Sequence, residues 1–444
     1  MACISRRGVL QAGVAASLLA AFKGRDAVAQ TAGSDVLWVQ VVAHGGWDQM
    51  LFTEPKRGWR DYGSTAIRQA GSIPYVDFPE VGPFFRAHGE RMLVFNGVDT
   101  FTNNHDVGVR HSRSGSLLEG FPVFPAQVAA AAGADRLLPM FTVYDYAETG
   151  GLLASNTIDW RSSQRLNELK EVARPPGVYR NGPGFVSDPS TPFLPPSVMQ
   201  RVAAAHEART QRLLDAATLP GHRKGLLALA RAHAAAKRMP ELNLAPQVTL
   251  PSGVASSSVL GQTLVLGAAA VNAFKQGLVT TLLVGQGDFD THGDNDATHR
   301  ERLGMIFTLT DFLLRQAETA NVPMAVVLTS DFGRTVVREG ATGTGHWPIS
   351  TMLVVQNAQA AAQQRLPVDR VIGGTTGDGA THTTNARAVL QARKINPHTL
   401  AFDDTGITPT PAHVYRVLRR AAGIDSHASL RDFPLNIDGD DLTV

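Results

Sequence analysis

Aspartate and histidine residues recur at the ends of predicted strands, and ligands commonly bind at that edge of an open α/β sheet. The five residues of this kind are Asp48, Asp290, His292, Asp331 and His346. Carboxylate and imidazole groups suit a divalent metal such as Zn²⁺, Mn²⁺, Mg²⁺, Ca²⁺ or iron. Asp290 and His292 lie two residues apart, close enough to bind one ion from two sides. The pattern predicts a divalent metal site at one edge of a sheet.

Each of these residues also has an ordinary structural role open to it. Asp331 could cap the turn that follows it, Asp48 could be a turn residue, and His346 could be an ordinary loop histidine. The metal interpretation therefore depends on their recurrence at successive strand ends.

Two further residues are candidates for binding an anion. His105 opens a helix that we expect to run from about Asn103 to Glu119, and a helix N-terminus favours anions. Arg334 lies just after a predicted strand. The alternatives are an Asn cap beside a solvent-exposed His105, and a surface salt bridge for Arg334.

Alternating strands and helices would position these residues. The expected strands are 35–43, 91–96, 137–144, 279–284, 324–328 and 351–355, and the other expected helices are 259–275, 300–320 and 411–423. The longest strands are continuous apolar runs, which is typical of strands buried on both faces. This order predicts an α/β fold with a doubly wound, mostly parallel sheet and helices on both faces. An Ala-rich segment with helical spacing, at about 195–245, predicts a helical insertion in a single domain spanning 30–444.

The first 29 residues have the features of a twin-arginine signal peptide. Arg6 and Arg7 precede a weakly apolar stretch that ends at Phe22, and small residues up to Ala29 offer a cleavage site. The stretch is too short for a stable membrane anchor. The alternative is an Arg-containing disordered N-terminus. We expect the Tat translocase to export the protein to the periplasm or beyond, with the signal cleaved near Ala29.

Composition narrows the function further. The chain has 444 residues, with 41 Lys and Arg and 39 Asp and Glu; cleavage after Ala29 would leave 37 and 38. That balance leaves no excess of positive charge to attract nucleic acid or an anionic membrane. The only cysteine, Cys3, lies in the signal, which excludes thiolate catalysis and Cys-ligated zinc from the mature chain.

Several motifs together resemble the bacterial family named domain of unknown function 1501. They are GGWD (45–48), NGVDTFTNNHD (96–106), FDTH (289–292), SDFGRT (330–335), GTGHW (343–347) and PAHVYRVLRRAAGI (411–424). The resemblance spans nearly all of the mature chain. That family is similar to sulfatases and belongs with the alkaline phosphatase superfamily, so the resemblance implies an alkaline phosphatase-like fold.

The same resemblance implies a bimetallic site. The ligands of one ion would be Asp290, His292 and His346, and those of the other would be Asp48 and Asp331. The nucleophile would lie near Thr102–His105, at the start of the helix after the second strand.

Two departures from the family pattern bear on activity. Phe332 follows Asp331 where the superfamily has a histidine, so the second site is a ligand short unless His44 or His105 supplies one. The absence of cysteine also excludes a sulfatase of the formylglycine type. Thr100, Thr102 and His105 are the candidate nucleophiles.

The sequence therefore predicts a periplasmic, metal-dependent hydrolase of a phosphate or sulfate ester, carried by a small molecule or a polymer. Its predicted catalytic residues are Thr102, His105 and Arg334. The alternative is a non-catalytic alkaline phosphatase-like module that binds or assembles an exported polymer. An oxidoreductase is disfavoured, because the turn after the first strand lacks the dinucleotide-binding glycine spacing.

Overall fold

The computed structural model describes residues 35–444, except 61, 135, 137, 144–146, 154–156, 159–194, 239–245, 247, 378–384 and 438. The predicted signal peptide lies outside the described residues. All the described residues belong to one compact unit. Among them, no helix has both the length and the apolar character needed to cross a membrane.

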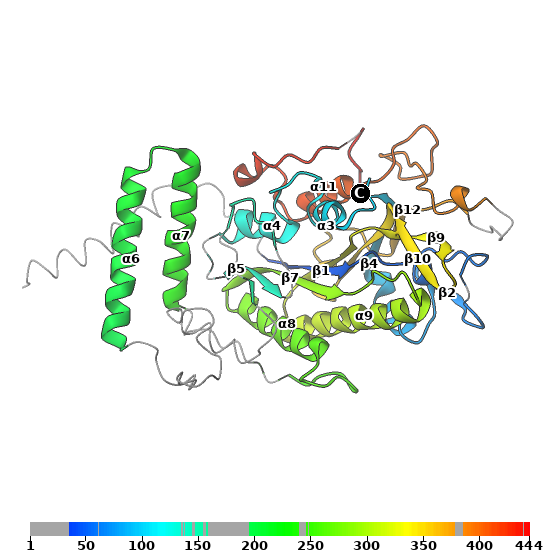
Figure 1. The fold of residues 1–444 in the computed structure, drawn as a ribbon, viewed down its shortest axis with the longest axis horizontal. Coiled ribbons are helices and arrows are strands. Elements are labelled where there is room, and N and C mark those ends of the chain that lie inside the picture. The colour runs from blue at the N-terminus through cyan, green and yellow to red at the C-terminus, as the bar shows by residue number, and fades with distance from the viewer. Residues whose placement is uncertain are drawn as a thin grey trace, which may run out of the picture. The chain divides into compact units, whose positions relative to one another are not determined.

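An eight-stranded sheet forms the centre of the fold (Figure 1). Its strand order is β12-β4-β11-β8-β1-β7-β5-β6. Its strands are β1 (Leu37–His44), β4 (Met92–Asp99), β5 (Leu138–Val143), β6 (Thr157–Ile158), β7 (Val279–Gly287), β8 (Met324–Ser330), β11 (Ile349–Gln356) and β12 (Arg370–Gly373). Strand β11 is antiparallel to both of its neighbours, and every other neighbouring pair is parallel. The predicted α/β fold with a mostly parallel sheet is confirmed, whereas the alkaline phosphatase-like identity stays a prediction.

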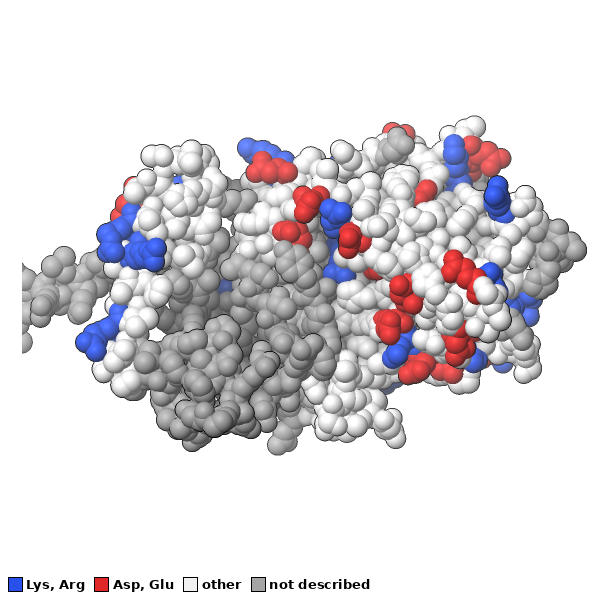
Figure 2. Space-filling model, in the orientation of Figure 1, with Lys and Arg blue, Asp and Glu red and all other residues white. Residues whose placement is uncertain are grey.

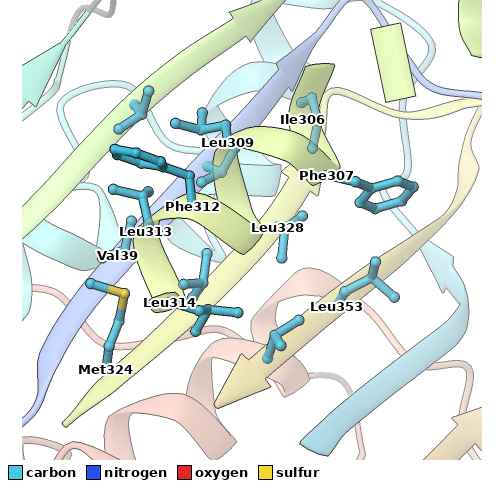
Figure 3. Close-up of a cluster of buried hydrophobic side chains, with 14 of the residues drawn as sticks. Val39, Ile306, Phe307, Leu309, Phe312, Leu313, Leu314, Met324, Leu328 and Leu353 are labelled. Carbon is cyan, nitrogen blue, oxygen red and sulfur yellow. The ribbon is translucent and has the colours of Figure 1, made fainter. Parts of the chain in front are cut away.

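Helices cover both faces of the sheet. One face carries α2 (Gly82–His88), α8 (Val259–Lys275) and α9 (Asn295–Ala320), and the other carries α3 (His105–Ser114), α4 (Phe124–Ala132) and α11 (Pro411–Ala421). Successive side chains of a strand point to opposite faces. In β1, Val39 accordingly enters the first core and Trp38 the second. Figure 3 shows Leu309 and Leu313 of α9 in the first core beside Val39. Two buried faces explain the uninterrupted apolar strands.

Smaller elements complete the described structure. Two hairpins are formed by β2 (Ile67–Ala70) with β3 (Ile73–Val76) and by β9 (Gly333–Glu339) with β10 (Gly343–Trp347). Two long helices, α6 (Pro196–Ala216) and α7 (Pro220–Arg238), lie in the segment where helices were predicted. The short helices are η1 (Gln49–Leu51), η2 (Gly89–Arg91), α10 (Ala358–Ala361), η4 (Ala386–Ala388) and η5 (Ala428–Leu430).

Two differences from the sequence-based expectations bear on the site. Helix α3 ends at Ser114 rather than near Glu119, because Gly115 adopts a left-handed conformation (φ 79°) and donates its N–H to the His111 carbonyl. Residues 343–347, which lie ahead of the expected strand 351–355 and outside every expected strand and helix, form strand β10. Its two glycines obscure any strand pattern in the sequence.

Candidate metal centre

The candidate site lies at the edge of the sheet where the parallel strands end. Asp290 follows β7, Asp331 follows β8, and His105 opens α3 after β4. His346 lies on β10, ahead of β11. Because β11 runs antiparallel, its beginning lies at the same edge as the ends of its neighbours. The direction of this one strand therefore brings His346 to the other residues.

Three side chains form a group that could hold a metal ion: His105, Asp290 and His346. Their potential ligand atoms all lie within 4.8 Å of one another. The Nε2 atom of His346 is 2.9 Å from Oδ1 of Asp290, and Nε2 of His105 is 3.3 Å from Oδ2. His292, also predicted as a ligand, lies beside this triad with its Nε2 3.1 Å from Asp290 Oδ1.

The second nitrogen of each histidine faces an oxygen acceptor. The three pairs are His105 Nδ1 with Asp331 Oδ2 (3.0 Å), His346 Nδ1 with the Asn103 carbonyl (2.8 Å) and His292 Nδ1 with Glu339 Oε2 (2.7 Å). These acceptors favour a proton on Nδ1, which leaves the Nε2 lone pair of each neutral imidazole directed at Asp290. Such carboxylate or carbonyl partners commonly orient metal-binding histidines.

The residues present fit a cation on chemical grounds. Neutral Nε2 atoms and the Asp290 carboxylate are all acceptors, and facing acceptors repel unless a proton or a cation lies between them. In addition, His105 Nε2 and Asp331 Oδ1 are buried with no hydrogen-bond partner among the described residues. Imidazole and carboxylate ligands together suit a borderline ion such as Zn²⁺ or Mn²⁺.

Electrostatics keep Asp290 charged. Burial raises the pKa of Asp290, but the hydrogen bond from Arg334 and the contact with the His346 ring outweigh it and leave the pKa well below its usual range. The hydrogen bond with Asp331 raises the pKa of the His105 imidazole. A cation bound beside Asp290 would therefore compete with a proton for His105.

Phe332 directly follows Asp331 and packs against the histidines of the triad. Its side chain is buried, with its ring 4.8 Å from the His105 ring and 4.5 Å from the His346 ring. Phe332 thus packs against two of the three triad residues. Of the two histidines expected to complete a second ion site, His105 contacts Asp331, whereas His44 accepts a hydrogen bond from Arg113 at Nδ1.

Arg334 is buried beneath the site rather than open to a substrate. The side chain is 0 % exposed. Its Nε donates to the Gly46 carbonyl (2.7 Å), and its Nη2 donates to the Phe289 carbonyl (2.6 Å) and to Asp290 Oδ1 (2.9 Å). Arg334 therefore holds Asp290 in place and ties together the turns after β1 and β7.

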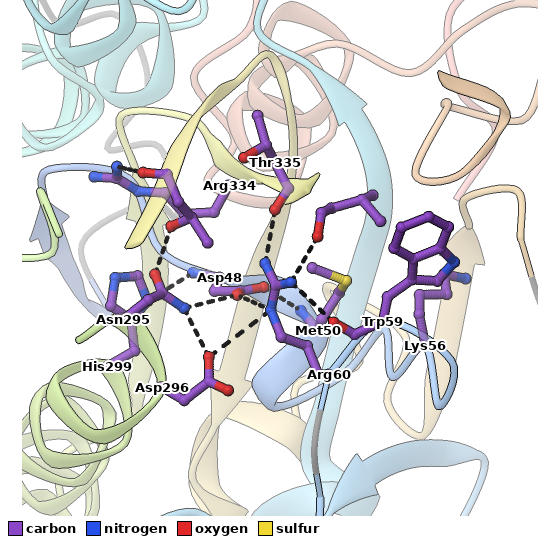
Figure 4. Close-up of polar contacts among 12 residues, drawn as sticks. Asp48, Met50, Lys56, Trp59, Arg60, Asn295, Asp296, His299, Arg334 and Thr335 are labelled. Atoms are coloured by element: carbon purple, nitrogen blue, oxygen red, sulfur yellow. Dashed lines mark hydrogen bonds and ion pairs between the residues drawn. The ribbon is translucent and has the colours of Figure 1, made fainter. Parts of the chain in front are cut away.

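Asp48 lies outside the triad. Its buried carboxylate accepts hydrogen bonds from Arg60 Nε (2.8 Å), Asn295 Nδ2 (3.1 Å) and the Met50 N–H (3.1 Å), as Figure 4 shows. These contacts match the alternative role of Asp48 as a turn residue. The Asp48 N–H donates to His299, so this network also fixes the start of α9.

Thr102 shapes the start of α3. Its hydroxyl oxygen accepts the Asn104 N–H (3.0 Å), and the Asn104 side chain accepts the Val107 N–H (3.3 Å). Sequence reasoning missed two residues that orient the histidines, Asn103 and Glu339. Asn103 acts through its backbone carbonyl, and Glu339 belongs to the unexpected hairpin, so neither gave a side-chain signal.

Glycines allow the turns of the site to approach one another closely. Gly45 has φ +104°, and a Cβ there would lie 2.4 Å from the Asp290 nitrogen. A Cβ on Gly108, one turn into α3, would lie 2.6 Å from the Asp331 carbonyl oxygen. Both contacts require glycine.

Comparison with known proteins adds no assignment. No family model matches the chain, and no curated protein matches it. The resemblance to the domain of unknown function 1501 family stays a prediction.

Proposed function

We propose that this protein is an exported hydrolase that uses a divalent metal ion to cleave a phosphate or sulfate ester. The observation that carries the proposal is the triad of His105, Asp290 and His346, whose potential ligand atoms lie within 4.8 Å of one another. The α/β sheet, with the triad at the end of its parallel strands, agrees with a ligand site. The motif resemblance to a sulfatase-like family favours ester hydrolysis over other metal chemistry.

In this proposal, some residues of the chain would bind the metal ion and others would orient those ligands. A bound divalent ion would polarise the ester and stabilise charge on the leaving oxygen. Asp290 would bind that ion as a carboxylate, and Arg334 keeps the Asp290 side chain ionised. Asp331 holds His105 through its Nδ1 atom. The start of α3, where His105 lies, favours the non-bridging oxygens of an anionic ester.

The ion-binding step is tested by metal analysis of protein purified without a tag. We expect bound Zn²⁺ or Mn²⁺, and thermal stability that rises on adding the ion. Asp290→Asn should abolish both. Asp432→Asn, which changes an exposed carboxylate elsewhere, should retain both. Absence of bound metal, with unfolding unchanged by Zn²⁺, Mn²⁺ or Ca²⁺, would rule the proposal out.

A non-catalytic module is the second candidate, and the nucleophile question favours it. Among the predicted catalytic residues, Thr102 accepts a backbone N–H and Arg334 is buried. Turnover of aryl phosphates and aryl sulfates with several metals separates the two functions. Turnover that disappears in Asp290→Asn supports the hydrolase. Metal binding without turnover of any such ester favours the module.

Export is a separate part of the proposal and rests on Arg6 and Arg7. Replacing both with Lys should leave the precursor in the cytoplasm of a bacterial host, because the twin-arginine pair is the recognised feature. Arg25→Lys, in the same segment, should export normally. Export of the double variant at the normal level would argue against this route.

A further inference from the structure

Helices α6 and α7 are much more basic than the rest of the chain. Residues 196–238 contain eight Lys or Arg and two Asp or Glu, whereas the rest of the chain after residue 29 contains 29 and 36. Helix α7 contains no acidic residue. Figure 2 shows Lys and Arg on the visible side of these helices, with acidic residues only at one edge. The near-neutral net charge of the whole protein therefore conceals a local excess of positive charge.

One side of α6 combines arginines with exposed aliphatic residues. Val202 and Leu213 are 41 % and 38 % exposed. They lie three helical turns apart and so face the same side. Arg201 and Arg212 have the same spacing along one flank, and Arg209 lies between the two aliphatic residues. All three arginines are exposed. We call these five residues the outer face of α6.

A different side of α6, its inner side, packs within the helix pair. Thr210 and Leu214 are buried there, and so is Leu226 of α7. Packing of the pair thus uses this inner side and leaves the outer face of α6 uncovered by α7. The association of the two helices therefore does not explain why Val202 and Leu213 lie on the outer face of α6.

We propose that the outer face of α6 docks reversibly on a bilayer surface that contains anionic phospholipid. Arginines bind lipid phosphates at the surface, while Val202 and Leu213 can enter the boundary between headgroups and acyl chains. Nucleic acid fits less well. Residues 196–238 contain no Phe, Trp or Tyr on which unpaired bases could stack. The proposal is independent of the hydrolase function, because it uses no residue of the metal centre.

Vesicle flotation of the full mature protein tests this docking. The probes are vesicles of phosphatidylcholine alone and vesicles that also contain phosphatidylglycerol. We expect binding only to the anionic vesicles, with binding lost at high salt because the arginines act through charge. Equal binding to both kinds of vesicle, or to neither, would overturn the proposal.

Variants locate the surface. Arg201→Glu, Arg209→Glu and Arg212→Glu together should weaken binding by more than about tenfold. Val202→Ser with Leu213→Ser should weaken it too, since polar residues gain nothing at the headgroup boundary. The matched control reverses three exposed arginines elsewhere, Arg57, Arg387 and Arg431, and should bind normally.

Two outcomes would show that the arginines of the outer face have another role. If the control triple loses as much binding as the α6 triple, then net charge rather than this face determines binding. If the protein binds duplex DNA through the same arginines and ignores anionic vesicles, then the partner is nucleic acid. Circular dichroism of each variant should match that of the parent, because all the altered side chains are surface-exposed.

Discussion

Two groups of histidines in this protein differ in what surrounds their ring nitrogens. His105, His292 and His346 point Nε2 at a carboxylate and hold Nδ1 against an acceptor. His111 and His299 are buried, and burial lowers the pKa of each to about 4. The first group suits ligation, and the second is neutral and structural.

The buried pair predicts a loss of stability in mild acid. In an unfolded chain, histidine titrates near pH 6.5, so below that pH the unfolded state takes up protons first. The free energy of unfolding should therefore fall between about pH 6.5 and pH 4, by up to about 3 kcal/mol for each residue. Urea denaturation across this range should show the decline. His299→Gln should flatten it, and His398→Gln, an exposed control, should not.

Arg334 allows a sharper test of the site's foundation. Arg334→Met leaves the Gly46 and Phe289 carbonyls without their buried donor and Asp290 without its cation, so it should lower the free energy of unfolding by about 1–3 kcal/mol and weaken metal binding. Lysine should not rescue it, because one ammonium cannot span the Gly46 and Phe289 carbonyls together with the carboxylate. Arg315→Met, which breaks an exposed pair with Asp311, should cost at most about 0.5 kcal/mol. Urea unfolding of Arg334→Met indistinguishable from that of the parent would contradict this role.

At the scale of elements, the site depends on how closely helix α3 approaches the turn after β8. Helix α3 reaches the turn after β8 only because Gly108 has no side chain. Gly108→Ala should push the helix away, lower the free energy of unfolding by about 1–3 kcal/mol and weaken metal binding. Gly225→Ala is a matched control in α7, where a Cβ would meet nothing within 4 Å. There the better helix propensity of alanine should add up to about 1 kcal/mol. Chemical denaturation with metal titration measures both, and equal effects of the two changes would refute the steric argument.

Much of the framework could be predicted from the sequence, because apolar runs buried on both faces leave an unmistakable pattern. The sheet's polar edge was predictable for the same reason, since Asp331 directly follows one such run and Asp290 lies in the turn after another. The role of Asp48 was less accessible. Its partner Arg60 lies in an irregular loop, and no periodic pattern connects the two. The antiparallel direction of β11 could not be predicted either, since an apolar run gives no sign of whether its strand pairs parallel or antiparallel.

At the scale of the whole molecule, the metal centre joins parts of the chain that are otherwise separate. His105, Asp290 and His346 come from α3, the turn after β7 and β10. An ion that binds all three binds only the folded state. At a free concentration one hundred times its dissociation constant, it should raise the free energy of unfolding by about 2.7 kcal/mol. Urea denaturation with and without chelator measures this, and the Asp290→Asn variant should show no difference.

The order of strands in the sheet also governs when the protein can begin to fold. Val39 of β1, near the start of the chain, lies opposite Leu282 of β7 and Val326 of β8. Contacts between such distant segments form slowly. On a ribosome, β1 gains neither neighbour until most of the chain has been synthesised. The ligands of the metal centre consequently meet only after synthesis is nearly complete, and a nascent chain has no site at which to capture an ion.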